Sequence, residues 1–282
     1  MNRVEWPLDV PAGPRPPVGV AVVSFNTVYL TAQMIYSLFR HIHAPRFRLV
    51  VVDNASTDGS AQMLRALADA GLCEVILNGE QRYHGPALNQ AIDHFARRQR
   101  VAEPDDRIGY VWVLDSDCMV TRADALTASV DLMRRTGAGI VGQRVYDRRH
   151  QGEIMGLHCL LLDPHQVLRA PVTPFVEDGS PSDALQHSAA RAGITAAEFP
   201  FTRDGYAVHL GRGTLRAIAE AEDRDNRYFA WARDHREPHF MEQDDAPARY
   251  AELVRHFTTE VAELTPASIV AACMRHASMP NP

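Results

Sequence analysis

Short runs of β-branched and apolar residues alternate with amphipathic patterns along the first half of the chain, and this alternation restricts the fold more than any other feature. Runs such as VGVAVVSF are almost continuously apolar, which predicts strands that are buried on both faces of a sheet. The intervening patterns repeat apolar residues at helical spacing. Strands that alternate with helices predict right-handed βαβ units, and therefore an α/β fold with a mostly parallel sheet and helices on both faces.

Polar loops that contain helix caps separate the expected elements. The predicted strands cover residues 18–25, 47–52, 73–77 and 110–114. The predicted helices cover 28–41, the stretch from the polar loop 53–60 to Gly71, and 85–98. Beyond residue 141 the pattern loosens, and we expect a strand pair around 156–162, a turn-rich stretch at 171–181 and a helix at 184–192 that ends before Gly193.

Changes in composition at the two ends of this pattern indicate the domain boundaries. Residues 1–17 are rich in proline, which predicts a flexible lead-in. Residues 18–213 form the expected main domain, which divides into the halves 18–120 and 121–213, and residues 214–282 are expected to be a helical C-terminal extension. A chain of 282 residues is long enough for such a domain to bury its core without help from disulfides.

The charged residues exclude several classes of function. The net charge of −6 provides no basic surface of the kind that a general nucleic-acid-binding protein needs, so no nucleic-acid partner is expected. All 29 basic residues are arginine. The absence of lysine excludes the P-loop lysine, Schiff-base chemistry and Ser-x-x-Lys nucleophile pairs.

The cysteines and the apolar runs indicate the compartment. The four cysteines are far apart in the sequence, so neither a disulfide framework nor a zinc site is expected. No apolar run approaches the roughly eighteen residues of a membrane-spanning helix, and the N-terminus does not have the pattern of a signal peptide. We therefore expect a cytoplasmic protein without a transmembrane segment, while peripheral membrane association stays open.

Polar residues stand where the predicted strands end, and ligands bind beyond the carboxyl ends of the strands in an α/β sheet. These residues are Ser24, Asn26, Asp53, Asn78, Asp115 and Asp117. The last two form a D-x-D pair, whose carboxylates can both face a hard divalent cation such as Mg²⁺ or Mn²⁺ that also binds substrate phosphates. An isolated D-x-D pair is more often a solvated turn or a helix cap, so its context decides.

Four motifs provide that context: VAVVSFN at 20–26, VVVDNASTDGS at 50–60, GPALNQAI at 85–92 and VLDSDC at 113–118. In order and spacing they resemble the nucleotide-sugar half of family 2 glycosyltransferases, which have the GT-A fold. The resemblance implies a metal-dependent enzyme that moves a sugar from a nucleoside-diphosphate donor and inverts the anomeric centre. It also implies that the first half of the main domain binds the donor and the second half binds the acceptor.

The resemblance implies roles for three of the strand-end aspartates. Asp53 would contact the nucleotide base, Asp115 the ribose or the metal, and Asp117 the cation. Because a carboxylate accepts an N–H from the pairing edge of a base, uracil and thymine are favoured over cytosine, and guanine stays compatible. Capping of the following helix is the alternative role for Asp53 and for Asp58.

The segment 78–89 lies where family members have their donor-binding loop and the helix that follows it. Gly85 would let the backbone approach the sugar nucleotide, since glycine has no side chain to obstruct it. Arg82 would contact a phosphate or the base through its fork of donors. Asn89 is expected to hydrogen-bond the backbone of the loop.

An inverting transfer needs a general base that takes the proton from the acceptor hydroxyl. Family members carry this carboxylate in an acidic pair before a helix, and the matching region here is FVEDGSPSDALQHSAARAG at 175–193. Asp183 is the first candidate for the base, and Glu177 and Asp178 are the alternatives. The competing interpretation is that Ser182 or Asp183 caps the helix that begins there.

The motif YAVHLGRGTLR at 206–216 resembles a late H-x-G-x-G element of the same family. His209 would be a third metal ligand or would contact the diphosphate, and Arg212 with its flanking glycines would bind phosphate oxygens. The other histidines have no spacing that is typical of a zinc enzyme.

Three other classes of protein share part of this pattern. A haloacid-dehalogenase-like phosphatase also has a strand followed by D-x-D, but Met119 stands where that motif has threonine or valine. A nucleotidyltransferase needs a glycine-rich basic loop after the first strand, which SFNTVYL does not provide. A catalytically silent nucleotide-sugar-binding partner protein stays compatible with the sequence.

The acceptor can be a glycan, a lipid carrier, a peptide or a small natural product, and the sequence leaves the oligomeric state open.

Overall fold

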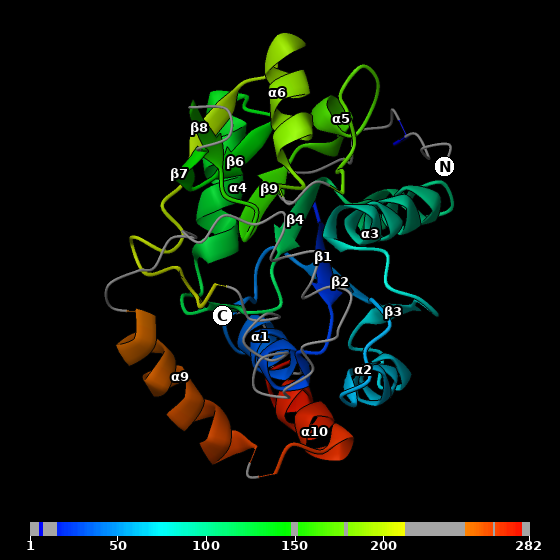
Figure 1. Cartoon of the computed structure of the whole chain (residues 1–282), viewed down its shortest axis with the longest axis vertical. Coiled ribbons are helices and arrows are strands. Elements are labelled where there is room, and N and C mark those ends of the chain that lie inside the picture. The colour runs from blue at the N-terminus through cyan, green and yellow to red at the C-terminus, as the bar shows by residue number, and fades with distance from the viewer. Residues whose placement is uncertain are drawn as a thin grey trace.

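The computed structural model describes residues 6–7, 16–147, 152–177, 180–211, 246–261 and 263–277. Its central sheet contains seven strands in the order β10-β6-β9-β4-β1-β2-β3 (Figure 1). Their bounds are β1 Val18–Ser24, β2 Phe47–Asp53, β3 Glu74–Leu77, β4 Tyr110–Leu114, β6 Ile140–Gly142, β9 Cys159–Leu162 and β10 Ala196–Glu198.

The middle of this sheet is parallel, as the sequence predicts. β1 pairs in parallel with β2 and β4, and β2 pairs in parallel with β3. Every residue of β1 is buried, because helices cover both of its faces. β9 runs antiparallel to both β4 and β6, so the sheet is mixed but mostly parallel. The predicted α/β fold with a mostly parallel sheet is confirmed.

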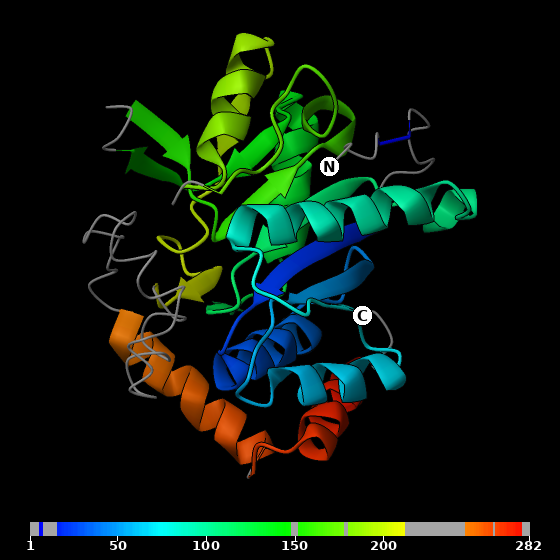
Figure 2. The ribbon, with the colours of Figure 1, turned by 45° about the vertical axis from the view of Figure 1, so that its right-hand side comes forward.

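Helices lie on both faces of the sheet, and each face has its own hydrophobic core. The helices are α1 Val28–His41, α2 Ser60–Asp69, α3 His84–Gln99, α4 Ala125–Thr136, α5 Pro164–Val167, α6 Asp183–Arg191, α9 Ala246–Glu260 and α10 Pro266–Ala277, with a 3₁₀ turn at Pro104–Asp106. Side chains of α1, α2, α4 and α10 pack on one face, and those of α3, α5 and α6 pack on the other. Figure 2 shows α3 on one side of β1 and β2, and α1, α2 and α10 on the opposite side.

The last helix belongs to the same core as the first strand. α10 packs against α1 and α2, and its residues Ile269, Ala272 and Cys273 are fully buried among them. The end of the region predicted as a helical extension therefore covers one face of the half formed by residues 18–120. The stretch 212–245, where the extension was predicted to begin, lies outside the described residues.

Two small sheets stand beside the central one. β5 (Cys118–Val120) pairs antiparallel with β11 (Ala207–His209), and β7 (Arg144–Asp147) pairs antiparallel with β8 (Gly152–Met155). The predicted strand pair around 156–162 is wrong: only β9 lies there. The residues CLLL of β9 are all buried, because the strand is inserted between β4 and β6 rather than forming a local hairpin.

One residue of the predicted lead-in is anchored. Trp6 is 3% exposed and packs in the core beneath α3 and α5, with its ring edge against His165 at 6.4 Å between centroids. The structure is therefore ordered at Trp6, where the sequence predicts a flexible lead-in.

Within the described part of the chain, no helix has both the length and the apolar character needed to cross a membrane.

Candidate active site

Three side chains that could bind a metal ion meet at the carboxyl end of β4. Ligand atoms of Asp115, Asp117 and His209 all lie within 4.8 Å of one another. Nε2 of His209 is 3.3 Å from Oδ1 of Asp117 and 3.6 Å from Oδ2 of Asp115. The structure thus brings together the three residues that the sequence proposed as metal ligands.

Strand pairing explains how residues about ninety positions apart come to meet. The turn after β4 carries both aspartates and leads into β5, which pairs with β11 so that Cys118 lies opposite His209. The N–H of Leu210 donates to the carbonyl of Asp117 at 3.2 Å and extends this pairing. The position of the imidazole relative to the carboxylates is therefore fixed by main-chain hydrogen bonds.

The charged forms of Asp115 and His209 stabilise each other. Burial alone would raise the pKa of Asp115, but His209 and His84 beside it hold that pKa well below its usual range. Burial alone would lower the pKa of His209, but Asp117 and Asp115 raise it well above its usual value. The two carboxylates thus stabilise a positive charge between them. Carboxylates suit Mg²⁺ and Mn²⁺ and imidazole is a common metal ligand, so this donor set fits a divalent cation.

One carboxylate oxygen of Asp53 has no hydrogen-bond partner among the described residues. The residue is 2% exposed, and its Oδ2 accepts a hydrogen bond from the N–H of Ser56 at 3.1 Å. Oδ1 is buried and has no hydrogen-bond partner among the described residues. Burial raises the pKa of Asp53, although the hydrogen bonds from Ser56 oppose the change. Because an unsatisfied buried carboxylate oxygen is costly, Oδ1 points to a polar partner that the described residues do not supply.

Asp58, in contrast, is a cap, which confirms the alternative given for it. Its Oδ1 accepts from the N–H of Ser60, the first residue of α2, at 3.0 Å. Its Oδ2 accepts from the N–H of Val28, the first residue of α1, at 2.7 Å. One carboxylate thus satisfies the beginnings of two helices.

Ser24 and Asn26 position the loops instead of lining an open site. Ser24 is fully buried, and its hydroxyl bonds that of Thr31 at 3.0 Å. Thr31 bonds Thr27, which bonds Ser116 between the two aspartates, so this chain of hydroxyls links β1 to the D-x-D turn. Asn26 has a φ of 50° and accepts from the N–H of Thr57 through Oδ1 at 2.8 Å, which fixes the loop after β2.

Asn78 and its neighbours form another positioning network. Nδ2 of Asn78 donates to Asn54 at 3.1 Å and to Gln90 of α3 at 2.9 Å, and its Oδ1 accepts from Gln90 at 3.0 Å. Oδ1 of Asn54 also accepts from the main-chain N–H of Arg82 at 2.9 Å. Both polar atoms of the Asn78 side chain are thus hydrogen-bonded within the protein.

The Nε of Arg82 is buried without a hydrogen-bond partner in the described ranges, which keeps Arg82 a candidate for binding an anion.

Gly85 is needed for a close approach, but the approaching group is the protein's own backbone. A Cβ at this position would lie 2.0 Å from the carbonyl oxygen of Val176. Asn89 fastens the same segment, since it donates to the carbonyl of Phe175 at 2.8 Å and accepts from its N–H at 3.2 Å. Asn89 bonds loop backbone as predicted, but that backbone belongs to the loop before α6 and not to the segment before α3. The loop before α6 is thereby held against the start of α3.

The candidate bases differ in exposure. Asp183 is the first residue of α6 and is 1% exposed, and Glu177 is exposed on the loop that precedes this helix. The N–H of Val176 donates to the carbonyl of Pro181 at 3.1 Å, which closes that loop. Ser182 occupies the N-cap position of α6 but makes no side-chain capping bond. The third candidate base, Asp178, and the phosphate-binding candidate Arg212 both lie outside the described residues.

Two histidines beside the three candidate metal ligands were missed by sequence reasoning. Nε2 of His84, at the start of α3, lies 3.6 Å from Oδ1 of Asp115. The ring of His158 stacks on that of His209 with centroids 4.6 Å apart and 6° between the planes. Burial and the neighbouring His209 lower the pKa of His158 to about 3. Neither histidine has a sequence signal, because only the tertiary fold brings them to the site.

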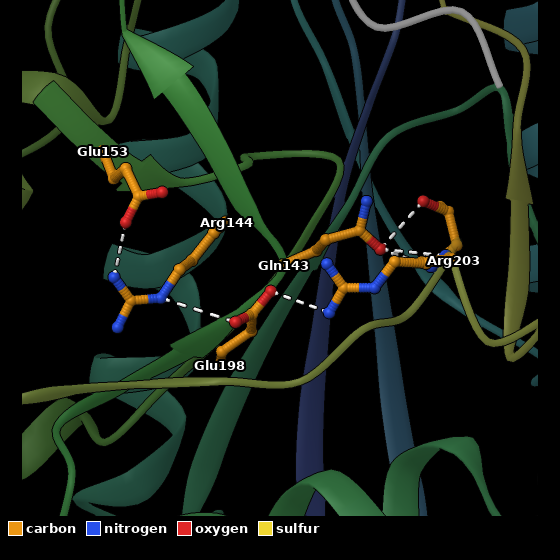
Figure 3. A network of polar contacts seen from close by, with 6 residues as sticks. Gln143, Arg144, Glu153, Glu198 and Arg203 are labelled. Carbon is orange, nitrogen blue, oxygen red and sulfur yellow. Dashed lines mark hydrogen bonds and ion pairs between the residues drawn. The ribbon is translucent and has the colours of Figure 1, made fainter. Parts of the chain in front are cut away.

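A polar network holds the segment that precedes β11 (Figure 3). Glu198 accepts from Arg203 at 2.9 Å and pairs with Arg144 at 3.5 Å, and Arg144 also pairs with Glu153 at 2.7 Å. Oε1 of Gln143 accepts from the main-chain N–H of Arg203 at 3.0 Å. The base of the β7–β8 hairpin is thus tied to the residues that lead to β11 and therefore to His209.

The chain belongs to glycosyl transferase family 2, because the model of that family matches residues 20–191, more than half of its length. It is accordingly a glycosyltransferase, as the sequence motifs indicate. No curated protein matches the chain.

Solved structures show the same fold. One is the mannosyltransferase PcManGT from Pyrobaculum calidifontis in complex with GDP-Man and Mn²⁺, with 21% identity, a TM-score of 0.53 and coverage of 96% of this chain and 77% of that one. Another is TarS 1–349 from S. aureus in complex with UDP-GlcNAc, with 14% identity, a TM-score of 0.53 and coverage of 92% and 72%. Both are GT-A glycosyltransferases, and the predicted GT-A fold is confirmed.

Proposed function

We propose that the protein transfers a sugar from a nucleoside-diphosphate donor to an acceptor hydroxyl, with inversion of the anomeric centre. The observation that carries this proposal is the convergence of Asp115, Asp117 and His209 within 4.8 Å at the carboxyl end of β4. These residues would hold Mg²⁺ or Mn²⁺, which, when bound, neutralises the negative charge that develops on the departing diphosphate. Membership of glycosyl transferase family 2 supports the reaction class.

Asp53 is proposed to select the base of the donor. Its Oδ1 is buried and lacks a partner among the described residues, so an N–H on the pairing edge of a base can donate to it. Uracil and thymine offer such an N–H, which supports UDP or dTDP donors, and guanine offers one as well. The solved structures of PcManGT and TarS contain GDP-Man and UDP-GlcNAc, which is consistent with a guanine base and with a uracil base in the donor.

Asp183 is proposed to take the proton from the acceptor hydroxyl as its oxygen attacks the anomeric carbon. Asp183 lies in the first turn of α6, and the loop before this helix packs against Gly85 at the start of α3. This packing supports the role. At that same end of α3, His84 lies 3.6 Å from Asp115. Glu177 on the loop is the alternative base.

We also infer a cytoplasmic location. All four cysteines are free and buried in the structure. Unpaired thiols are typical of a reducing compartment.

The proposed reaction is tested by incubating the purified protein with UDP-, dTDP- and GDP-sugars and measuring the release of the nucleoside diphosphate. We expect release with at least one donor in the presence of Mn²⁺ or Mg²⁺, loss of release in excess chelator, and recovery when the cation is restored. Full release in chelator would reject the metal role of Asp117. Nucleotide binding without release from any donor, whichever acceptor class is added, would instead favour a catalytically silent binding protein.

A further inference from the structure

His158 contacts two of the three residues proposed to bind the cation, although it is not one of those three. Its ring stacks almost parallel on the ring of His209, with 4.6 Å between centroids. Its main-chain carbonyl accepts a hydrogen bond from the N–H of Asp115 at 3.1 Å. His158 thus contacts one candidate metal-binding residue on β11 and another at the end of β4.

The chain around His158 leaves its ring little room to move. The residue is 8% exposed. A Cβ at Gly156 would lie 2.6 Å from Cε1 of His158 and 3.1 Å from Val145, so the ring occupies the space that a side chain would otherwise fill. The N–H of Gly156 donates to the carbonyl of Gln143 at 2.8 Å, which fixes the backbone behind the ring. The imidazole of His158 therefore packs closely against this backbone as well as on the ring of His209.

The main chain of His158 continues the sheet by one step. Leu114 and Cys159 are paired in the antiparallel ladder of β4 and β9. The hydrogen bond from Asp115 to His158 extends that ladder past the end of β4, and the turn then closes through the N–H of Cys118, which donates to the carbonyl of Asp115 at 3.0 Å. The direction in which the Asp115 carboxylate leaves the backbone is thus set by this pair of bonds.

Stacking, rather than a hydrogen bond at the ring tip, holds the imidazole of His158. Its Nε2 is buried and has no hydrogen-bond partner within the described part of the chain. A flat ring of similar size could make the same stacking contact. Substitution of His158 by another residue with a flat ring therefore separates the contribution of the ring nitrogens from that of the ring's packing.

We propose that His158 is a positioning residue of the cation site, which orients the imidazole of His209 by stacking and the carboxylate of Asp115 through the main chain. This inference rests on the proposed role of Asp115, Asp117 and His209 in binding a divalent cation. Residues that orient metal ligands contribute to metal affinity without touching the metal, and their loss typically weakens affinity by roughly 10–100-fold.

The test measures the affinity of the full chain for Mn²⁺ alone, by the electron paramagnetic resonance signal of the free ion. His158→Ala is expected to weaken Mn²⁺ binding by roughly 10–100-fold, and His158→Phe, which keeps a flat ring, is expected to bind Mn²⁺ with about the wild-type affinity. At saturating Mn²⁺ the kcat of His158→Ala should recover, because only ligand orientation is lost. His256→Ala, at an exposed position of α9, serves as the matched control and should bind as the wild type does.

Thermal unfolding in chelator shows whether each variant is folded, and the interpretation uses only folded variants. Wild-type affinity in His158→Ala would overturn the inference. A loss in His158→Phe equal to that in His158→Ala would also overturn it, because the ring nitrogens and not the stacking would then matter. Absence of Mn²⁺ binding by the wild type, or undiminished binding by Asp117→Asn, would instead reject the proposed cation site itself. If His158→Phe does not fold, the affinity of His158→Ala decides.

Discussion

Replacing Asp117 with asparagine is expected to lower sugar transfer by about a thousandfold, which corresponds to about 4 kcal/mol of lost transition-state stabilisation. Asp117 is 5% exposed, and its Oδ1 lies 3.3 Å from Nε2 of His209. Asparagine keeps the shape of the side chain but removes the charge that would hold a cation. The measurement is the initial rate of nucleoside-diphosphate release over a range of Mn²⁺ concentrations.

The matched control for this variant is Asp124→Asn. Asp124 lies after β5 and is paired with Arg122 at 2.8 Å, but its side chain is 52% exposed and is not one of the three candidate metal ligands. Surface substitutions change free energies by about 0.5 kcal/mol or less, so the control should stay within about twofold of the wild type. A loss of only about tenfold in Asp117→Asn, or ~1.4 kcal/mol, would mean that Asp117 does not bind an essential cation.

Replacing Asp183 with asparagine is expected to lower kcat by about 10²–10⁴-fold, the range usually contributed by a general base. The KM of the donor should change little, because Asp183 acts on the acceptor hydroxyl and not on the nucleotide. The residue opens α6, next to the loop that packs on the start of α3. The measurement is a comparison of kcat and donor KM in the variant and the wild type, with thermal unfolding as the check that the buried position tolerates an amide.

Glu177→Gln is the paired variant that distinguishes the two candidate bases. Glu177 is exposed on the loop before α6, so its substitution should not disturb the fold. We expect this variant to retain most of the wild-type kcat. A large loss in Glu177→Gln together with near-normal turnover in Asp183→Asn would assign the base to Glu177.

The central elements of the fold were predictable because burial on both faces leaves a strong sequence pattern. The run 18–25 predicts a strand and forms β1 (Val18–Ser24), and the pattern at 28–41 predicts a helix and forms α1 with the same bounds. The predicted helices at 85–98 and 184–192 also form, within about one residue at each end. Such elements are fixed by local periodicity together with caps such as Asp58.

Long-range pairing was not predictable from the sequence. The four residues of β9 are apolar throughout, and this pattern does not distinguish a local hairpin from an antiparallel strand inserted between β4 and β6. The prolines around Trp6 predict a flexible lead-in, but burial of its large indole in the core offsets the cost of ordering the segment.

The candidate site divides in the same way. The D-x-D pair could be found because its strand and its motif are local, and His209 was found through a second local motif. Its 3.3 Å distance to Asp117 depends on the pairing of β5 with β11, which the sequence does not specify. His84 and His158 reach the group only through the packing of α3 and β9, so no local signal identified them.

The most direct test of the central claim is the unfolding temperature of the full chain with UDP, dTDP or GDP, each with and without Mn²⁺. A ligand at about one hundred times its Kd adds about 2.7 kcal/mol to the free energy of unfolding, which raises the unfolding temperature by several degrees. We predict that at least one of these nucleotides, most of all UDP or dTDP, stabilises the protein only when Mn²⁺ is present. Stabilisation by none of them, with or without Mn²⁺, would contradict a metal-dependent nucleoside-diphosphate site.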